Sequence, residues 1–546
     1  MIKIKISSVH LILFVSAFII LINNRVFFSE VSKRLDIYSL QGGSYVLTFS
    51  LMMIAVLALF FLIVGQKYLL KALLILFLIV SSIMSYFTQE LGVIFEVDMI
   101  RNVVETIKDN NKQEALELLS PPLLWHVFLL GLLPSFFVLI TNIQYKTASK
   151  EILSRIIYSV GVISVVLAMF MLNFKYMSFF SRENRDLRVY VTPVFPVLSL
   201  YSYTHNELAS KDIVFEERGT DAQQRKQHKK RTVGIFIVGE TARADHFSLN
   251  GYTKETNPLL KKQTVYNFSN VSSCGTSTAF SVPCMFSFLK RGDYSPTKAR
   301  KESNVLDVLT TAGIKTVWLD NNSSCKNVCD RIETINYKNA PHPFIDSPYY
   351  DHNEYYDAVI TDKLDEFIDK TNKDILIVFH SFGSHGPSYY KRYPKEFAQF
   401  KPYCKKSSPQ ECNSEEIKNA YDNTILYTDY VLNQVIEHLK SKTDQYESFM
   451  FYASDHGESL GEKGVYLHGL PYWLAPKAQT HIPLIAWFSK DYVKNHQLDL
   501  NTLHANKDTN YSHDNISHSL LDLYDVSADV YQADKNMFLH KQAIHP

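Results

Sequence analysis

Hydrophobic positions are distributed very unevenly along this chain of 546 residues. Up to about residue 180 long apolar runs dominate, whereas beyond about residue 205 the sequence has the mixed pattern of an ordinary globular domain. A helix needs roughly 20 apolar residues to cross a bilayer. Five stretches approach that length, and we expect them to be membrane-spanning helices: Val9–Leu21 (extending to about Phe28), Val46–Val64, Leu69–Phe87, Leu123–Ile140 and Ile156–Leu172.

The first apolar stretch has a second interpretation, because Lys3 and Lys5 precede it as basic residues precede the core of a signal peptide. Four further spans follow, so we favour an uncleaved helix. Basic residues in short loops set orientation, and here they fall on one side, the expected cytoplasmic side. They are Lys3, Lys5, Lys67, Lys71, Lys146, Lys150 and Arg155. The large C-terminal region is then outside, which in a bacterium is the periplasm.

The loop between the third and fourth spans is too long for a simple turn. Met99–Ile107 and Gln113–Leu119 have the spacing of amphipathic helices and are expected at the outer membrane surface. After the fifth span an interfacial segment is expected, although a mere tether explains it nearly as well. We therefore expect a membrane domain over 1–176, an interfacial segment and linker over 177–231, and a soluble domain over 232–546.

From Thr232 onward, helix patterns alternate with strand patterns. Each of three predicted helices is followed by a predicted strand, and alternation of this kind favours a largely parallel sheet with helices on both faces. The pairs are Ser303–Gly313 with Ile314–Leu319, Ala358–Asp369 with Ile375–Phe379, and Asn419–Leu439 with the strand that contains Phe449. The expected fold class is therefore an α-helical membrane domain joined to an α/β soluble domain.

Charge and cysteine usage agree with this division. The net charge is only +1, which argues against a nucleic-acid partner. All six cysteines lie in the soluble part, and an even, closely spaced set is typical of disulfides in an oxidising compartment. A structural zinc site is the rival interpretation, but the chain has no C-x-x-C pair. The spacing suggests the local pairs Cys274–Cys284, Cys325–Cys329 and Cys404–Cys412.

Two predicted strands end in residues that can bind a metal ion. Thr232–Val238 runs into Glu240, and Phe449–Ser454 runs into Asp455 and His456. Open α/β sheets place ligand sites just beyond the carboxyl ends of their strands, so these residues can converge. Two carboxylates and one imidazole suit Zn²⁺ or Mn²⁺, and the spacing does not choose between them. Asp-His-Gly alone would be a surface turn, but the matching position of Glu240 favours a metal site.

Thr278 is the residue we expect to complete this shell and to act as the nucleophile. A threonine hydroxyl is a poor nucleophile until a metal or a base lowers its pKa. Thr276, Ser277 and Ser281 are nearby rivals, and Ser277 or Thr278 could simply cap a helix. The two roles can coincide, because a helix N-terminus also favours a bound phosphate.

Further polar residues follow other predicted strands. His385 comes shortly after Ile375–Phe379, and His468 follows the Asp-His pair by a short loop. Each could be a donor to phosphate, a general acid or a second metal ligand, although lone loop histidines are often incidental. Asn322 and Lys326, beyond the strand at 314–319, could also hold a phosphate group.

Several motifs occur in a characteristic order: Gly239-Glu-Thr-Ala-Arg-Ala-Asp-His246, Asn257-Pro-Leu259, Ser273-Cys-Gly-Thr-Ser-Thr-Ala279, Val282-Pro-Cys284 and Ser454-Asp-His-Gly-Glu458. Together they resemble the lipid A phosphoethanolamine transferases, a family that includes the mobile colistin-resistance enzymes. The resemblance covers essentially the whole chain. It implies five transmembrane helices and an alkaline-phosphatase/sulfatase-like domain facing the periplasm, and the three cysteine pairs match pairings of the family.

The resemblance also assigns roles to residues. It implies that a catalytic zinc ion is bound by Glu240, Thr278, Asp455 and His456, with Thr278 as the acceptor of phosphoethanolamine. It implies that the residues around the bound head group are Asn322, Lys326, His385 and His468, the two histidines being candidates for the general acid. It places lipid-binding positions at Asn102, Thr106 and Glu114.

The expected reaction moves phosphoethanolamine from phosphatidylethanolamine to a lipid A phosphate through a phosphoethanolamine-threonine intermediate. The added ammonium group should weaken the binding of cationic peptides such as polymyxins. One alternative keeps this chemistry but changes the acceptor to an inner-core lipopolysaccharide sugar or another envelope molecule. A second is a membrane-anchored binding or sensor protein, which would have no need of an activated threonine beside a metal. We expect a monomer in the inner membrane.

Overall fold

The computed structural model describes residues 5–108, 116–209, 213–225, 228–337, 347–351, 354–362 and 364–538. The chain divides into two compact units. One contains Met1–Ile100 and Leu119–Tyr203, and the other contains Arg101–Leu118 and Thr204–Pro546. The domain limits expected at residues 176 and 231 stay predictions, and the two units are described separately below.

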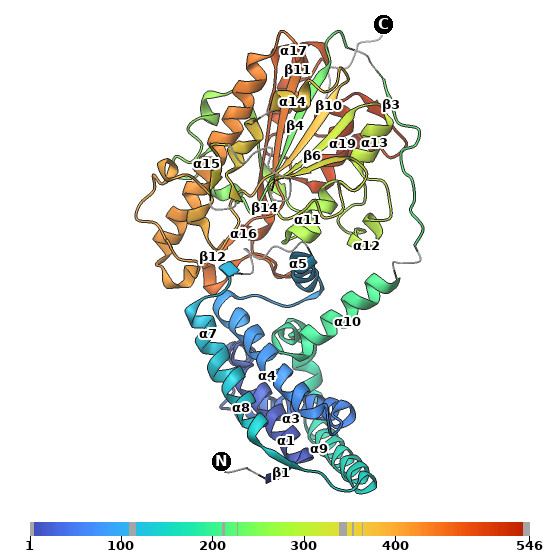
Figure 1. Cartoon of the computed structure of the whole chain (residues 1–546), viewed down its shortest axis with the longest axis vertical. Helices are drawn as coiled ribbons and strands as arrows, with labels where there is room; N and C mark the ends of the chain where they lie inside the picture. Colours follow the sequence, from blue (N-terminus) through green and yellow to red (C-terminus); the bar gives the residue numbers. More distant parts are fainter. Residues whose placement is uncertain are drawn as a thin grey trace. The chain divides into compact units, whose positions relative to one another are not determined.

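The first unit is helical, as its apolar pattern predicts (Figure 1). Four helical stretches are long and apolar enough to cross a membrane: Leu40–Val64, Leu70–Leu91, Pro121–Ile140 and Ala148–Phe174. They are built from α3 (Leu40–Val64), α4 (Leu70–Tyr86) with η1 (Phe87–Leu91), α7 (Pro121–Val127) with η2 (Phe128–Leu132) and α8 (Leu133–Ile140), and α9 (Ala148–Glu183). These stretches confirm four of the expected spans by length and composition.

The first expected span is broken. α1 (Ser8–Ile22) and α2 (Arg25–Arg34) are bent by 54° and are long enough to cross only if they are taken together. Asn24 lies at the break, where its side-chain amide donates hydrogen bonds to the carbonyl oxygens of Ile19 and Thr192. A buried asparagine that bonds to backbone in this way competes with continuation of the helix. The apolar pattern alone does not reveal the bend.

The segment between the third and fourth spans contains the amphipathic helix expected near residue 100. This helix, α5, covers Val97–Lys108. The second amphipathic helix, expected at Gln113–Leu119, lies partly outside the described residues. Between α9 and the soluble domain lie a 3₁₀ helix, η3 (Arg185–Tyr190), and α10 (Val194–Ala209).

The second unit is built on one mixed sheet of eight strands, in the order β15-β5-β14-β11-β4-β10-β6-β7 (Figure 1). The run from β11 to β7 is parallel, and β14 is antiparallel to both of its neighbours. The α/β fold and its largely parallel sheet are thus confirmed. The strands are β4 (Thr232–Gly239), β5 (Val265–Ser272), β6 (Lys315–Asp320), β7 (Glu333–Asn336), β10 (Ile375–His380), β11 (Glu447–Ser454), β14 (His481–Phe488) and β15 (Tyr511–Ser512).

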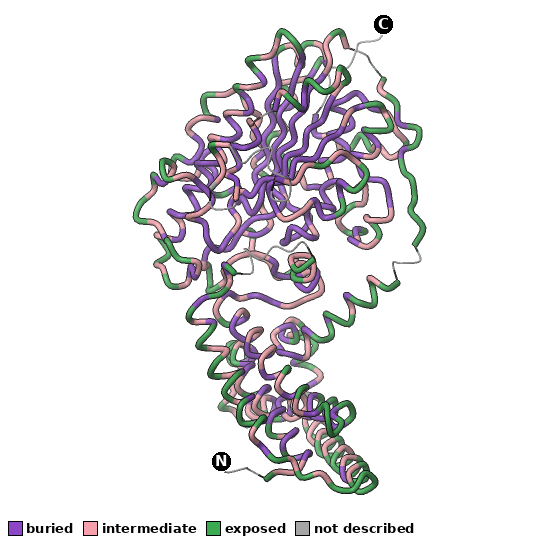
Figure 2. The backbone as a smooth tube through the Cα atoms, in the orientation of Figure 1, coloured by how far each residue is buried: buried purple, intermediate pink, exposed green. Residues whose placement is uncertain are grey.

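The central strand β4 is buried along its whole length (Figure 2). Successive side chains of a strand point to opposite faces. Accordingly, Ile235 and Ile237 pack into the core under α15 (Ser414–Ser441), and Phe236 packs into the core on the other face. The helices α13 (Val305–Thr311) and α19 (Ile516–Leu523) contribute to that second core. A strand covered on both faces must be continuously apolar, which is how it is recognised in the sequence.

The helix expected at Ala358–Asp369 is divided in two. A 3₁₀ turn, η8, covers Asp357–Thr361, and α14 covers Leu364–Ile368. The Thr361 hydroxyl donates to the Ala358 carbonyl oxygen at 2.7 Å, and such a local bond competes with a continuous helix. The long helix expected from Asn419 instead begins at Ser414, where Asn413 and Glu416 form a capping box.

The smaller elements complete the second unit. Its other helices are α11 (Thr278–Met285), α12 (Pro296–Ala299), α16 (Lys477–Thr480), α17 (Lys490–Asn495) and α18 (Leu500–Ala505). Paired short strands are β3 (Gln223–Gln224) with β16 (Val526–Ser527), β8 (Tyr350–Asp351) with β9 (Glu354–Tyr355), and β12 (Ser459–Leu460) with β13 (Tyr466–Leu467). In the first unit, β1 (Lys5–Ser7) pairs with β2 (Asn142–Gln144).

The three disulfides expected from cysteine spacing are present: Cys274–Cys284, Cys325–Cys329 and Cys404–Cys412. The first links the loop after β5 to α11, and the second closes a short turn after β6. Both hold loops that lie beyond strands of the main sheet.

Candidate metal centre and active site

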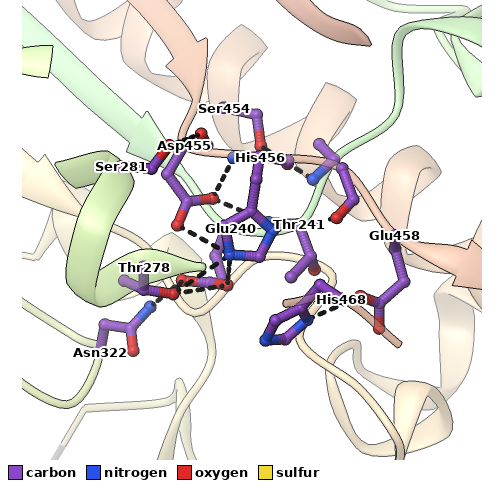
Figure 3. A network of polar contacts seen from close by, with 12 residues as sticks. Glu240, Thr241, Thr278, Ser281, Asn322, Ser454, Asp455, His456, Glu458 and His468 are labelled. Carbon is purple, nitrogen blue, oxygen red and sulfur yellow. Dashed lines mark hydrogen bonds and ion pairs between the residues drawn. The ribbon is translucent and has the colours of Figure 1, made fainter. Parts of the chain in front are cut away.

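Four of the residues singled out in the sequence lie together beyond the carboxyl ends of β4 and β11. These two strands are parallel neighbours with Gly239 opposite Ser454, so Glu240 and Asp455 leave the sheet side by side. Thr278 begins α11, and its side chain points at Glu240 and His456 (Figure 3). None of the four is more than 6% exposed. The expected convergence of strand ends therefore occurs.

The polar atoms of this group lie within contact distance of one another. The Thr278 Oγ1 atom is 3.1 Å from Glu240 Oε2 and 3.3 Å from His456 Nε2. His456 Nε2 is also 3.3 Å from Asp455 Oδ2 and 3.6 Å from Glu240 Oε1. One imidazole nitrogen thus faces both carboxylates and the hydroxyl.

The protonation state of His456 decides whether its Nε2 atom can act as a metal ligand. Its Nδ1 atom lies 2.9 Å from the Gly457 carbonyl oxygen, which can only accept, so Nδ1 carries the hydrogen. Burial, followed by the charge of His468, lowers the pKa of His456 well below its usual value. The imidazole is therefore neutral, and Nε2 presents a lone pair to the carboxylates.

Burial makes the two carboxylates costly to ionise. Burial and the neighbouring Asp455 raise the pKa of Glu240 well above its usual value, and burial raises that of Asp455. Asp455 Oδ2 is buried and makes no hydrogen bond to the described residues. Two carboxylate oxygens and an imidazole lone pair aimed at one point form a donor set that suits a divalent cation. Glu240, Asp455 and His456 could hold such an ion, with Thr278 beside it.

Surrounding groups keep these ligands in place. The Thr241 backbone N–H donates to Asp455 Oδ1 at 3.1 Å, and Thr241 has a φ of 54°, in the left-handed region. Such a conformation costs a β-branched residue on the order of 1–3 kcal/mol. Here the strained backbone of Thr241 places the N–H group that orients the Asp455 carboxylate. Asn322 Nδ2 donates to Glu240 Oε2 at 2.9 Å.

Two of the three rivals of Thr278 donate to backbone carbonyl oxygens. Thr276 Oγ1 donates to the Leu470 carbonyl oxygen, and Ser281 Oγ donates to the Asp455 carbonyl oxygen, each at 2.6 Å. Ser277 is the N-cap residue of α11 and makes no hydrogen bond with its buried Oγ to the described residues. Of these hydroxyls, that of Thr278 contacts the carboxylate and imidazole group.

His468 and His385 lie beside this group, as the sequence suggests. The ring centroid of His468 is 4.4 Å from that of His456 and 5.7 Å from that of His385. His468 Nδ1 is 2.8 Å from Oε2 of Glu458, which is fully buried (Figure 3). Sequence reasoning gave Glu458 no role. Its position in the Asp-His-Gly-Glu motif was the available signal, but the motif does not say which side chain Glu458 contacts.

The phosphate-binding residues expected after β6 have other contacts here. The Asn322 amide bonds to Glu240 and to the Ser381 carbonyl oxygen, so it positions a candidate metal ligand. The Lys326 ammonium donates to Ser323 Oγ at 2.8 Å. Their contact with a head group stays a prediction.

The expected lipid-binding positions are only partly described. Asn102 and Thr106 are half-buried and lie one turn apart on α5, while Glu114 lies outside the described residues. Glu117, which the sequence analysis did not single out, is buried and pairs with Arg392 at 2.7 Å. No motif marks this pair, because it joins positions 275 residues apart.

Models of two known protein families match this chain. A model described as "Sulfatase" matches residues 232–526, and one described as "Phosphoethanolamine transferase EptA/EptB" matches residues 53–208. Phosphoethanolamine transferase EptA of Escherichia coli strain K12 is 37% identical over 93% of this chain and 92% of its own length. Phosphatidylethanolamine transferase Mcr-1 of Escherichia coli is 37% identical over 98% of each protein.

A solved structure resembles nearly the whole chain. The integral membrane protein lipooligosaccharide phosphoethanolamine transferase A of Neisseria meningitidis superposes with a TM-score of 0.92 and 32% identity. The match covers 98% of this chain and 99% of that one. Both the helical unit and the sheet unit therefore have counterparts in one known protein.

Proposed function

This chain belongs to the phosphoethanolamine transferase family, and from that premise we propose that it transfers phosphoethanolamine from phosphatidylethanolamine to a lipid A phosphate. The proposed setting is the bacterial inner membrane with the second unit in the periplasm. Apolar helices and three disulfides support that setting. The whole-length similarity to EptA and Mcr-1 supports the reaction class.

The observation that carries the proposal is the position of Thr278. Its hydroxyl contacts a buried carboxylate and a neutral imidazole nitrogen, and it lies in the first turn of α11. Backbone N–H groups at a helix N-terminus favour a negatively charged group such as a phosphate. A binding protein would have no need of a hydroxyl in this position.

We propose Zn²⁺ as the cofactor, held by Glu240, Asp455, His456 and the Thr278 oxygen. When bound, such an ion would lower the pKa of the Thr278 hydroxyl and offset negative charge on the phosphoryl oxygens. The donor set of two carboxylates and one neutral imidazole supports this assignment. The Asn322 amide and the Thr241 N–H hold the two carboxylates in their orientation.

The first half-reaction forms a bond between Thr278 Oγ and the phosphorus of phosphatidylethanolamine. The bond from phosphorus to the diacylglycerol oxygen breaks, and that oxygen takes up a proton. His468 is the proposed proton donor, because Glu458 holds its Nδ1 atom and leaves Nε2 on the other side of the ring. Glu240 Oε2, 3.1 Å from Thr278 Oγ1, is placed to accept the hydroxyl proton.

The second half-reaction releases the threonine. A lipid A phosphate oxygen attacks the same phosphorus, the bond from phosphorus to Thr278 Oγ breaks, and Thr278 recovers a proton. Two half-reactions at one residue predict ping-pong kinetics. The product carries an added ammonium group, which should weaken binding of polymyxins to the membrane.

Mass spectrometry of lipid A tests the proposal in cells that express the wild-type chain, Thr278→Ala or Ser277→Ala. We expect a phosphoethanolamine adduct with the wild type and with Ser277→Ala, and none with Thr278→Ala at equal protein level. An adduct with Thr278→Ala would overturn the nucleophile. Modification of core sugars with unmodified lipid A would replace the proposed acceptor by the inner-core alternative, and no modified envelope lipid at all would overturn the transfer reaction.

A further inference from the structure

A second buried cluster of metal-ligating side chains lies at the opposite end of the main sheet. Glu447 begins β11, whose other end leads to Asp455. Eight strand residues at about 3.3 Å each separate the two sites by roughly 25 Å. His228 lies before β4, His496 follows α17 and Asp525 precedes β16. This histidine–carboxylate cluster is thus distinct from the Thr278 site.

The two histidine rings bridge the same pair of carboxylate oxygens. His496 Nε2 is 2.9 Å from Glu447 Oε1, and His496 Nδ1 is 2.8 Å from Asp525 Oδ2. His228 Nε2 is 2.9 Å from that same Asp525 oxygen, and His228 Nδ1 is 4.0 Å from that same Glu447 oxygen. The rings stack with centroids 3.9 Å apart.

Asp525 Oδ2 therefore lies beside both imidazoles. A carboxylate can only accept, so the hydrogen bond between His228 Nε2 and Asp525 puts the hydrogen of a neutral His228 ring on Nε2 and its lone pair on Nδ1, on the Glu447 side. His496 turns its Nε2 atom to the same Glu447 oxygen. A carboxylate that holds the outer nitrogen of a histidine is the usual support of a histidine metal ligand.

The cluster is buried and contains two carboxylates. The side chains of Glu447, Asp525, His228 and His496 are 0%, 7%, 9% and 1% exposed. Buried carboxylates need a compensating charge. Ligand atoms of Glu447, His228 and His496 lie close enough together to hold one divalent cation, which would supply that charge.

Glu447 is itself held in place. Its Oε2 accepts a hydrogen bond from Asn495 Nδ2 at 2.6 Å, and its Oε1 accepts one from Thr232 Oγ1 at 3.2 Å. Ligand atoms of a tetrahedral zinc ion lie roughly 3.3 Å apart, given bonds of about 2.0–2.1 Å. The observed separations of 2.9 and 4.0 Å from Glu447 Oε1 to the two nitrogens bracket that value.

We propose that His228 Nδ1, His496 Nε2 and Glu447 bind a structural divalent cation of the zinc class, with Asp525 orienting His228. The ion joins the segment before β4 to elements from the last hundred residues of the chain. The proposal does not depend on the transferase activity, because none of these residues contacts the Thr278 site.

Metal content of the full-length protein in detergent tests the site. The protein is stripped with a chelator, loaded with Zn²⁺ alone, desalted, and analysed by mass spectrometry for ions per chain. We expect two ions in the wild type, one in His228→Gln and one in Glu447→Gln. His438→Gln is the matched control, because His438 also pairs with a carboxylate, that of Asp365 at 3.0 Å, but belongs to no such cluster among the described residues.

Further variants distinguish metal binding at this cluster from metal binding at the Thr278 site. Asp455→Asn should remove the other ion, so Asp455→Asn combined with Glu447→Gln should hold none. If the Thr278 site binds no zinc, the wild type holds one ion, and Glu447→Gln still removes it. Equal zinc content in the wild type, His228→Gln and Glu447→Gln would overturn the proposal. Co²⁺ loading gives a second readout, since visible absorption that persists in Asp455→Asn should disappear in the double variant.

Discussion

The Thr278 hydroxyl oxygen lies 3.1 Å from Oε2 of Glu240, a carboxylate that is fully buried at the end of the central strand β4. Neighbouring hydroxyls, those of Thr276 and Ser281, donate to backbone carbonyl oxygens instead. A hydroxyl that contacts a carboxylate can lose its proton to it, whereas one bound to a carbonyl oxygen has no base. This difference supports Thr278 as the proposed nucleophile in a stretch rich in serine and threonine.

Retaining the hydroxyl of residue 278 should retain the reaction. We expect Thr278→Ser to keep transfer within about tenfold of the wild type, because only a methyl group is lost. Thr278→Ala should lower the rate by about a thousandfold or more, as loss of a covalent nucleophile does. The measurement is transfer from a fluorescent phosphatidylethanolamine. Equal rates for the Ser and Ala variants would contradict the assignment.

Asn322 should govern metal affinity through Glu240. Its amide donates to Glu240 Oε2 at 2.9 Å, and removal of a group that orients a ligand typically weakens binding by about 10–100-fold. We expect Asn322→Ala to show that loss in competition with a zinc chelator. Asn270→Ala is the control, because Asn270 is exposed on β5 and pairs with Asn510. Unchanged zinc affinity in Asn322→Ala would refute this role.

Glu458 should act through His468. Glu458→Gln removes the charge that holds His468 Nδ1 at 2.8 Å, so we expect kcat to fall about 10–100-fold with little change in KM. The alkaline limb of the rate profile, where the proton donor is lost, should move to lower pH, because an imidazolium without its carboxylate partner is a stronger acid. Tyr389→Phe, which removes only the other hydrogen bond to Glu458, is the control. A Glu458→Gln profile identical to that of the wild type would exclude the coupling.

His518 should make the soluble unit less stable in acid. Burial lowers its pKa to about 4, and the Gln532 backbone N–H donates to His518 Nδ1 at 3.2 Å, which requires an unprotonated nitrogen. The unfolded chain takes up a proton near pH 6.5, whereas the folded chain resists it until about pH 4. The stabilisation is therefore complete above pH 6.5 and is lost as the pH falls towards 4.

Denaturant unfolding of the full-length protein at pH 7 and pH 5 measures this effect. We expect the wild type to lose about 1–2 kcal/mol more than His518→Asn between these values, because asparagine keeps an acceptor but does not titrate. His438→Asn, at a half-buried surface pair, should behave like the wild type. A loss of the same size in His518→Asn would assign the acid sensitivity to other groups.

Much of the site could be predicted because strand ends are local features. β4 and β11 are recognisable as continuous apolar runs, and residues that directly follow parallel neighbours must lie at one edge of the sheet. Glu240, Asp455 and His456 were found in this way. The cysteine pairs were predictable for a similar reason, since each closes a separation of ten residues or fewer.

Other features depend on contacts between distant segments. The pairing of His228 with Asp525 joins positions 297 residues apart, and that of Glu117 with Arg392 joins positions 275 residues apart. The antiparallel direction of β14 could not be predicted either, because a buried strand has the same apolar pattern in either direction.

By itself, the sequence determined the helical unit, the α/β domain and the candidate metal ligands, because hydrophobic periodicity and strand ends are properties of short segments, and it already favoured Thr278 as the nucleophile. The tertiary structure alone decided the bend at Asn24, the contacts of Thr278 with Glu240 and His456, and the cluster of His228, His496, Glu447 and Asp525. Each of these depends on contacts between residues that are far apart in the sequence, and local patterns do not specify such contacts.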